Sequence, residues 1–226
     1  MHQKKPLIST SLETTNSPSK ICILLHGYGD NAENFISITR DLLIPELKIN
    51  FYVPNAPSFV PQYPTGRQWF DLYPNGINFN DAGPKEKEMM KKDCESSLEL
   101  IKNFTENLCK KLKLTLQDCF IIGFSQGAMM AFEFGKYVDK KFAGCALISG
   151  RILPSDNHAK NVFSKTPIII IHGDQDTVLE PKYFDEACSI LKNQGYFYED
   201  HLLVNEAHTI SNNATKLIKN FIKKNL

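Results

Sequence analysis

The sequence predicts an α/β fold with a mostly parallel central sheet and helices on both faces. Short apolar runs alternate with longer amphipathic segments along the chain, which is typical of this architecture. One apolar run, residues 168–171, consists of four isoleucines, as expected for a strand buried on both faces. The 226 residues suit one domain that buries about 70% of its unfolded surface. We therefore expect a single domain over residues 1–226 without a large cap.

Six strands and five helices follow from the hydrophobic pattern. Strands are expected near residues 20–26, 49–53, 118–123, 143–148, 167–171 and 197–204. Helices are expected near residues 32–43, 86–112, 126–138, 182–194 and 211–224. Two of these helices have a clear apolar stripe, which includes Leu98 and Ile101 in one and Ile218 and Phe221 in the other. Residues 1–19 form an N-terminal extension or an added edge strand at residues 7–10.

Ser125 is the candidate nucleophile. It lies in the G-x-S-x-G pentapeptide of residues 123–127, directly after the apolar run 119–122 and before a segment rich in Ala, Met and Phe. This strand–turn–helix context is typical of a nucleophile elbow, in which a sharp turn exposes the serine hydroxyl above the sheet edge. Gly123 and Gly127 lack the Cβ atoms that would collide in so tight a turn.

A serine hydroxyl is a weak nucleophile at neutral pH, so the elbow requires a histidine base and a carboxylate that orients it. In the sequence, the acid and then the histidine should follow such an elbow. Asp174 and Asp176 both follow the isoleucine strand, and His208 lies in a loop after the expected last strand. We favour Asp176, which lies deeper in its loop, whereas Asp174 is placed to stabilise the turn.

Two main-chain N–H groups are candidates for an oxyanion hole. The residue after the nucleophile, Gln126, supplies the first by its position. The loop after the expected strand 20–26 supplies the second, since Gly27 and Gly29 flank Tyr28 and allow its N–H to face the pocket. The alternative is an ordinary glycine turn between a strand and a helix.

Several blocks of the chain, taken together, resemble the phospholipase/carboxylesterase group of α/β-hydrolases, which includes the acyl-protein thioesterases, and are closest to its bacterial branch. The blocks are residues 25–30 (LHGYGD), 54–57 (PNAP), 66–72 (GRQWFDL), 123–130 (GFSQGAMM), 172–176 (HGDQD) and 208–210 (HTI). The resemblance runs from about Lys20 to the C-terminus and implies the α/β-hydrolase fold.

The resemblance also implies an activity: hydrolysis of carboxylic esters or thioesters by a Ser125/Asp176/His208 triad, with the N–H groups of Tyr28 and Gln126 as the oxyanion hole. The expected substrate is a small acyl ester or thioester, an acylated protein or a lysophospholipid. The alternatives are lysophospholipase activity and a non-catalytic binding protein of the same fold. Retention of all three triad residue types favours the enzyme.

The long segment from Pro54 to Pro84 is rich in Pro, Asn, Gly and aromatic residues. The resemblance implies that the stretch after Trp69 borders the acyl pocket, and we expect Leu72 and Tyr73 to bind substrate there. A hydrophobic cluster tied down over the sheet is the alternative. A segment of this length is usually functional or disordered, and its aromatic content argues against disorder.

Composition excludes several other functions. The net charge is +1, so charge alone implies no nucleic-acid partner. The six cysteines are dispersed without a C-x-x-C pair, which argues against a metal site and favours a reducing compartment. No apolar run approaches a membrane span, so we expect no integral membrane association. We expect a cytoplasmic enzyme that uses no cofactor and no metal.

Overall fold

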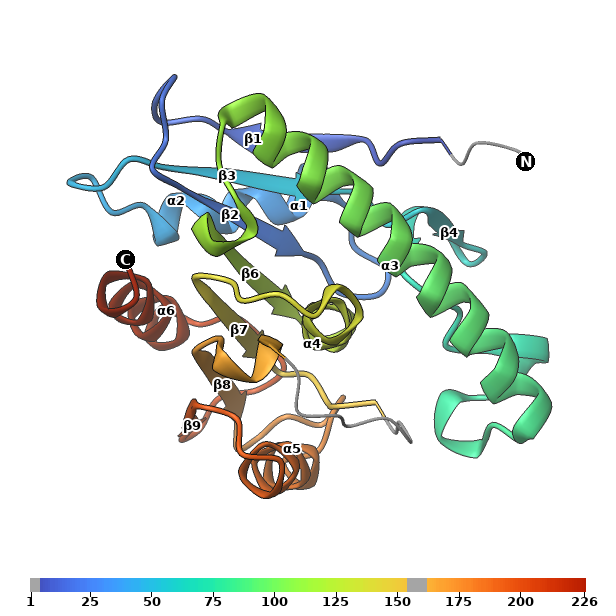
Figure 1. The fold of residues 1–226 in the computed structure, drawn as a ribbon. Coiled ribbons are helices and arrows are strands. Elements are labelled where there is room, and N and C mark those ends of the chain that lie inside the picture. Colours follow the sequence, from blue (N-terminus) through green and yellow to red (C-terminus); the bar gives the residue numbers. More distant parts are fainter. Residues whose placement is uncertain (1–4, 154–161) are drawn as a thin grey trace.

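The computed structural model describes residues 5–153 and 162–226, which build an α/β fold around a seven-stranded sheet (Figure 1). The strand order is β1-β3-β2-β6-β7-β8-β9. The strands are β1 (Ser9–Leu12), β2 (Lys20–Leu25), β3 (Ile49–Pro54), β6 (Cys119–Phe124), β7 (Gly144–Ile148), β8 (Ile168–Gly173) and β9 (Tyr198–Leu203). β1 is antiparallel to β3, and the other neighbours are parallel. The predicted fold class is therefore confirmed, with β1 starting two residues later than the predicted edge strand.

The central strands are apolar on both faces because each face is covered by helices. In β2, Ile21, Ile23 and Leu25 belong to one core, whereas Cys22 and Leu24 belong to the other. This division follows from the alternation of side chains across a strand. The isoleucines of β8 divide between the two cores in the same way, so the sheet is buried throughout its centre.

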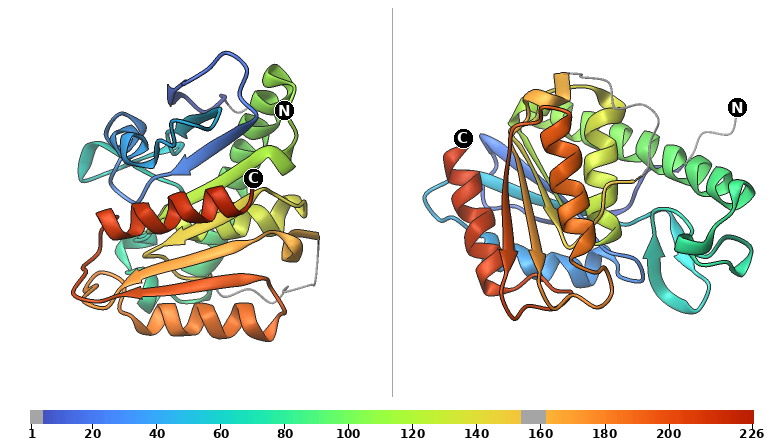
Figure 2. Two further views of the ribbon diagram at one scale, coloured as in Figure 1. Left: turned by 90° about the vertical axis from the view of Figure 1, so that its left-hand side faces the viewer. Right: turned by 90° about the horizontal axis from the view of Figure 1, so that it is seen from below.

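The helices divide between the two faces of the sheet (Figures 1 and 2). α3 (Pro84–Leu112), α4 (Gln126–Val138) and α5 (Lys182–Asn193) contribute to one core, and α1 (Ala32–Phe35), α2 (Thr39–Leu42) and α6 (Asn212–Lys224) to the other. The predicted helix 32–43 is not continuous, because a 3₁₀ turn separates α1 from α2. Ile36, Ile38 and Thr39 are β-branched, which lowers the helix propensity of this segment.

The segment between β3 and α3 is more ordered than the sequence indicates. It contains a hairpin of β4 (Ser58–Val60) and β5 (Tyr63–Gln68), followed by two 3₁₀ turns. Trp69 and Phe70 are buried in the core that α3 and α4 also line, which agrees with the alternative of a hydrophobic cluster over the sheet. Within the described residues, neither this segment nor any other forms a large cap. No helix in residues 5–153 or 162–226 is long and apolar enough to cross a membrane.

Strand register brings the predicted site loops to one edge of the sheet. Leu25 pairs with Gly123, and Gly173 pairs with Leu203, so β2, β6, β8 and β9 end close to the same level. Active-site groups on open parallel sheets lie in the loops beyond such carboxyl ends. The loops that carry Tyr28, Ser125, Asp176 and His208 all begin at this edge.

Candidate active site

Ser125 occupies a strained turn between β6 and α4. Its φ of 54° and ψ of −119° are unfavourable for a residue with a side chain. A main-chain hydrogen bond of 2.9 Å from its N–H to the Ile148 carbonyl holds the turn against β7. Backbone strain that the surrounding structure maintains is common at functional sites, where the direction of a side chain is important.

The two glycines of the pentapeptide are required by close backbone approach. A Cβ on Gly127 would collide with the carbonyl of Leu25 in β2, and one on Gly123 would collide with the carbonyl of Gly127. Helix α4 therefore begins in direct contact with the backbone of the sheet. The pattern of residues 123–127 predicted this turn because only glycine fits both positions.

Asp176 and His208 are joined by a hydrogen bond. Asp176 is 2% exposed, and Oδ2 of its carboxylate lies 2.7 Å from Nδ1 of His208. Its Oδ1 accepts hydrogen bonds from the main-chain N–H groups of Val178 and Leu179, at 2.9 and 2.8 Å. A buried carboxylate must be satisfied by protein donors, and these contacts fix its direction.

His172 adds a contact to Asp176 that sequence reasoning missed. Its Nε2 lies 3.4 Å from Oδ2 of Asp176 and 2.8 Å from the Leu179 carbonyl oxygen. The short contact indicates a proton on Nε2 that is donated to the carbonyl, so the ring braces the loop that carries the acid. The pattern gave no signal for this contact beyond the position of His172 at the end of β8.

Asp174 has a different environment from Asp176. Its Oδ1 accepts a 2.6 Å hydrogen bond from the N–H of Asn205, and its own N–H donates to the Leu203 carbonyl. Asp174 thus ties the end of β8 to the start of the loop that leads to His208. This is the turn-stabilising role that its position predicted.

The imidazole of His208 packs against the ring of Phe124, the residue that precedes Ser125. The centroids of the His208 imidazole and the Phe124 ring are 4.9 Å apart, and 16% of the histidine side chain is accessible. Among the described residues, no hydrogen bond joins the imidazole to the hydroxyl of Ser125. Catalytic hydrogen bonds of this kind are often long without substrate and shorten when it binds.

Both predicted oxyanion residues are close to Ser125 along the chain or in space. A Cβ built on Gly27 would be 3.3 Å from Cβ of Ser125, so the loop containing Tyr28 passes close to the serine. Gln126 is the first residue of α4, whose N-terminus favours negative charge. Within the described residues, neither the Tyr28 N–H nor the Gln126 N–H has a hydrogen-bond acceptor.

A second network, which the sequence did not reveal, holds residues 69–70 beside these donors. The side chain of Gln126 accepts from the Trp69 N–H at 2.9 Å and donates to the Phe70 carbonyl at 2.7 Å. The indole N–H of Trp69 donates to the carbonyl of His26 at 2.9 Å. The hydroxyl of Ser97, in α3, donates to the Trp69 carbonyl. Each of these groups is buried.

The two residues predicted to bind substrate differ in exposure. Tyr73 is 44% exposed, and its ring centroid lies 6.1 Å from that of Tyr28. Leu72 is half-buried and packs against the core of the α3 face. Tyr73 is thus beside one predicted oxyanion residue, whereas Leu72 lies at the border between the core and the surface.

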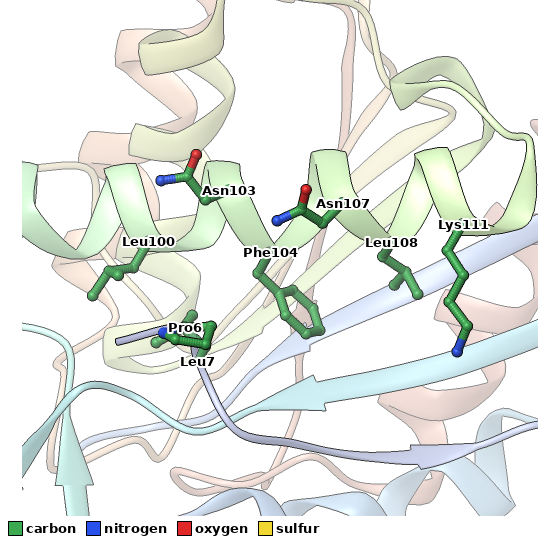
Figure 3. A pocket seen from close by; sticks show the side chains of 8 residues that line it. All are labelled: Pro6, Leu7, Leu100, Asn103, Phe104, Asn107, Leu108 and Lys111. Carbon is green, nitrogen blue, oxygen red and sulfur yellow. The ribbon is translucent and has the colours of Figure 1, made fainter. Parts of the chain in front are cut away.

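A separate concavity of about 440 Å³ lies between α3 and the N-terminal segment (Figure 3). Leu100, Phe104 and Leu108 of α3 line it from one side, and Pro6 and Leu7 from the other. None of the residues predicted for the active site lines it. In the described parts of the chain, no three His, Cys, Asp or Glu side chains gather as metal ligands would.

The mostly parallel sheet with its strained serine turn defines an α/β-hydrolase. The family described as Phospholipase/Carboxylesterase matches residues 10–226, so the chain belongs to this family and is a hydrolase that acts on ester bonds. It is 28% identical to acyl-protein thioesterase 1 of Candida albicans, over 92% of this chain and 95% of that protein. It is 27% identical to carboxylesterase SOBER1 of Arabidopsis thaliana, over 89% of each.

Solved structures agree with this assignment. The crystal structure of esterase PE8 superposes with a TM-score of 0.85 at 26% identity, covering 98% of this chain and 100% of that one. The crystal structure of Arabidopsis thaliana SOBER1, at 22% identity, superposes with a TM-score of 0.78 and so shows the shared fold. The predicted family resemblance is confirmed.

Proposed function

We propose that the protein hydrolyses carboxylic esters or thioesters through an acyl-enzyme on Ser125, with His208 as the general base and Asp176 as its orienting acid. The observation that carries the proposal is the 2.7 Å contact between the buried Asp176 carboxylate and Nδ1 of His208, beside a strained serine turn. An imidazole that donates from Nδ1 has its Nε2 lone pair available to accept a proton.

The chemistry then follows in two halves. The Ser125 oxygen attacks the substrate carbonyl carbon while its proton passes to Nε2 of His208. The tetrahedral intermediate collapses, the bond to the leaving alcohol or thiol breaks, and His208 returns the proton to that group. A water molecule, deprotonated by His208, attacks the acyl-serine in the second half. The carboxylate product leaves and Ser125 regains its proton.

The N–H groups of Tyr28 and Gln126 stabilise the negative oxygen in both halves. Their lack of acceptors in the described structure, and the position of Gln126 at the start of the 13-residue helix α4, support this role. Fixed donors aimed at a developing oxyanion are usually the largest single contribution in such a site.

The substrate we propose is a small acyl ester or thioester whose chain lies along Leu72 and Tyr73. Relatives named acyl-protein thioesterase and carboxylesterase support both bond types and an acylated protein as substrate, and the family description Phospholipase/Carboxylesterase supports a lysophospholipid. The six cysteines are free thiols, which supports the proposal of a reducing compartment such as the cytoplasm.

Labelling with a fluorophosphonate tests the proposal directly. We expect one phosphonate per chain at neutral pH, mapped by peptide mass spectrometry to the peptide that contains Ser125. His208→Ala should slow labelling strongly because the base is lost, whereas His201→Ala, in β9, should label at the wild-type rate. Wild-type protein that neither labels nor hydrolyses any ester would instead indicate a non-catalytic binding protein.

A further inference from the structure

Trp69 links the two elements that carry the oxyanion donors. It is the only tryptophan of the chain and is 1% exposed. Its indole N–H donates to the carbonyl of His26, two residues before Tyr28. Its main-chain N–H donates to the side chain of Gln126, the residue that supplies the other donor. One residue is therefore hydrogen-bonded to both sides of the site.

Trp69 and its neighbour Phe70 make further hydrogen bonds and a ring contact. The Ser97 hydroxyl of α3 donates to its carbonyl, and the Gln126 amide donates to the carbonyl of the next residue, Phe70. The indole also packs against the His26 imidazole, with ring centroids 5.3 Å apart. These contacts fix both the backbone and the ring of Trp69, so it cannot shift without disturbing its partners.

Packing alone accounts for the burial of the indole but not for this arrangement of polar contacts. Apolar side chains fill the same core without hydrogen bonds, whereas every polar group of Trp69 has a protein partner. Its two donor groups meet the loop after β2 and the start of α4, which come from distant parts of the chain. Placement errors of about 1 Å in a catalytic group can cost 10²-fold in rate.

We propose that Trp69 is a positioning residue of the oxyanion hole, which fixes the separation between the Tyr28 and Gln126 N–H groups through its indole and main-chain hydrogen bonds. This inference rests on the proposed function, because it assumes that these N–H groups bind the oxyanion. It extends that function by assigning a role to a residue that does not touch the substrate.

The test compares Trp69→Phe, which removes the indole N–H but keeps an aromatic ring, with a packing control. Phe142→Leu is the control, since Phe142 is fully buried in the same core but precedes β7, at the opposite edge of the sheet. The kcat and KM for a short-chain ester are measured, together with the Ki of an alkyl trifluoromethyl ketone. The ketone adds to the serine and leaves a negative oxygen in the oxyanion hole.

We expect Trp69→Phe to lower kcat about tenfold or more with KM nearly unchanged, because an oxyanion donor that is removed outright costs about 10²–10³ in kcat. The Ki of the ketone should rise by the factor that kcat/KM loses. Phe142→Leu should lower thermal stability but leave kcat and Ki within about threefold of wild type. Ser97→Ala should shift kcat and Ki in the same direction by a smaller factor.

A folded Trp69→Phe enzyme with wild-type kcat and Ki would overturn the proposal, as would equal losses in Phe142→Leu. If Trp69→Phe does not fold, Ser97→Ala decides, and wild-type kcat and Ki in that variant would overturn the proposal. Wild-type protein without any esterase activity would refute the proposed function itself, which is a distinguishable result.

Discussion

The carboxylate of Asp176 and the imidazole of His208 meet at 2.7 Å, although they come from the loops after β8 and β9. Asp176 is 2% exposed, so its charge is balanced by fixed donors rather than by water. Two main-chain N–H groups hold Oδ1, which leaves Oδ2 to face the histidine. The hydrogen bond between Asp176 and His208 therefore determines which nitrogen of His208 carries the proton.

Replacing Asp176 by Asn tests this relationship. The amide would present N–H to Nδ1 of His208, force the proton onto Nε2 and remove the lone pair that accepts the serine proton. We expect kcat to fall by about 10⁴, as in related triads. Steady-state kinetics of the purified variant on a short-chain ester measures this fall.

Asp174→Asn is the matched control. Asn retains an oxygen that can accept from the Asn205 N–H, so the turn should lose no more than about 1 kcal/mol and the folded enzyme should keep its turnover. If Asp174→Asn loses activity and Asp176→Asn keeps it, the acid has been assigned to the wrong aspartate.

A charge at Leu72 should alter acyl-chain selectivity. An apolar wall gains about 0.8 kcal/mol for each CH₂ group that it removes from water, which is roughly fourfold in binding. We expect Leu72→Asp to lower kcat/KM for an octanoyl ester much more than for an acetyl ester, because the acetyl group reaches only Ser125 and the oxyanion donors. The wild-type kcat/KM should rise with chain length and then level off.

The control for an added charge is Phe197→Asp. Phe197 is exposed and precedes β9, at the edge of the sheet opposite the site, so chain-length selectivity should not change. Equal losses on acetyl and octanoyl esters in Leu72→Asp would place the acyl pocket elsewhere. A flat wild-type profile would favour a small-ester carboxylesterase over a depalmitoylating enzyme.

Buried His26 should make the fold sensitive to acid. Its Nε2 accepts from the Ala56 N–H at 3.1 Å, so the ring is neutral and its Nδ1 donates to the Gly27 carbonyl. Burial lowers the pKa of His26 below its usual value of 6.5. The unfolded chain then binds the proton more readily, so the stability that neutral His26 contributes is complete above pH 6.5 and is lost as the pH falls through the folded pKa.

The measurement is the free energy of unfolding of wild type and His26→Gln from pH 8 to pH 5. Below pH 6.5 the wild type should lose up to about 1.4 kcal/mol per pH unit more than the variant, which is the limit for one proton. Parallel slopes for the two proteins would show that His26 does not titrate on unfolding in this range.

Much of this architecture could be predicted because it depends on local sequence. The isoleucine run of β8 indicated a strand buried on both faces, and the glycines around Ser125 indicated a turn that only they can form. The chain order of the elbow, Asp176 and His208 then predicted which loops should meet. The hydrogen bond between those two side chains agrees with that order.

The remainder depends on contacts between distant residues, which a local pattern does not encode. Pro61, Pro64 and Gly66 indicate a loop, yet Pro64 and Gly66 lie within β5 of the β4–β5 hairpin, whose register shifts between Phe59 and Val60. The bonds from Gln126 to Trp69 and Phe70 span more than fifty positions. No sequence pattern predicts the hydrogen-bond partners of the glutamine that follows the nucleophile, so only the folded structure identifies them.

The turnover of Ser125→Ala tests the central claim most directly. Ser125 is half-buried and Ala removes only its hydroxyl, so the replacement should leave thermal unfolding close to that of the wild type, which serves as the control for folding. With the nucleophile removed, kcat should fall by about 10⁶ on a short-chain ester, the scale found for serine hydrolase triads. A folded Ser125→Ala protein with turnover within tenfold of wild type would contradict an acyl-enzyme on Ser125.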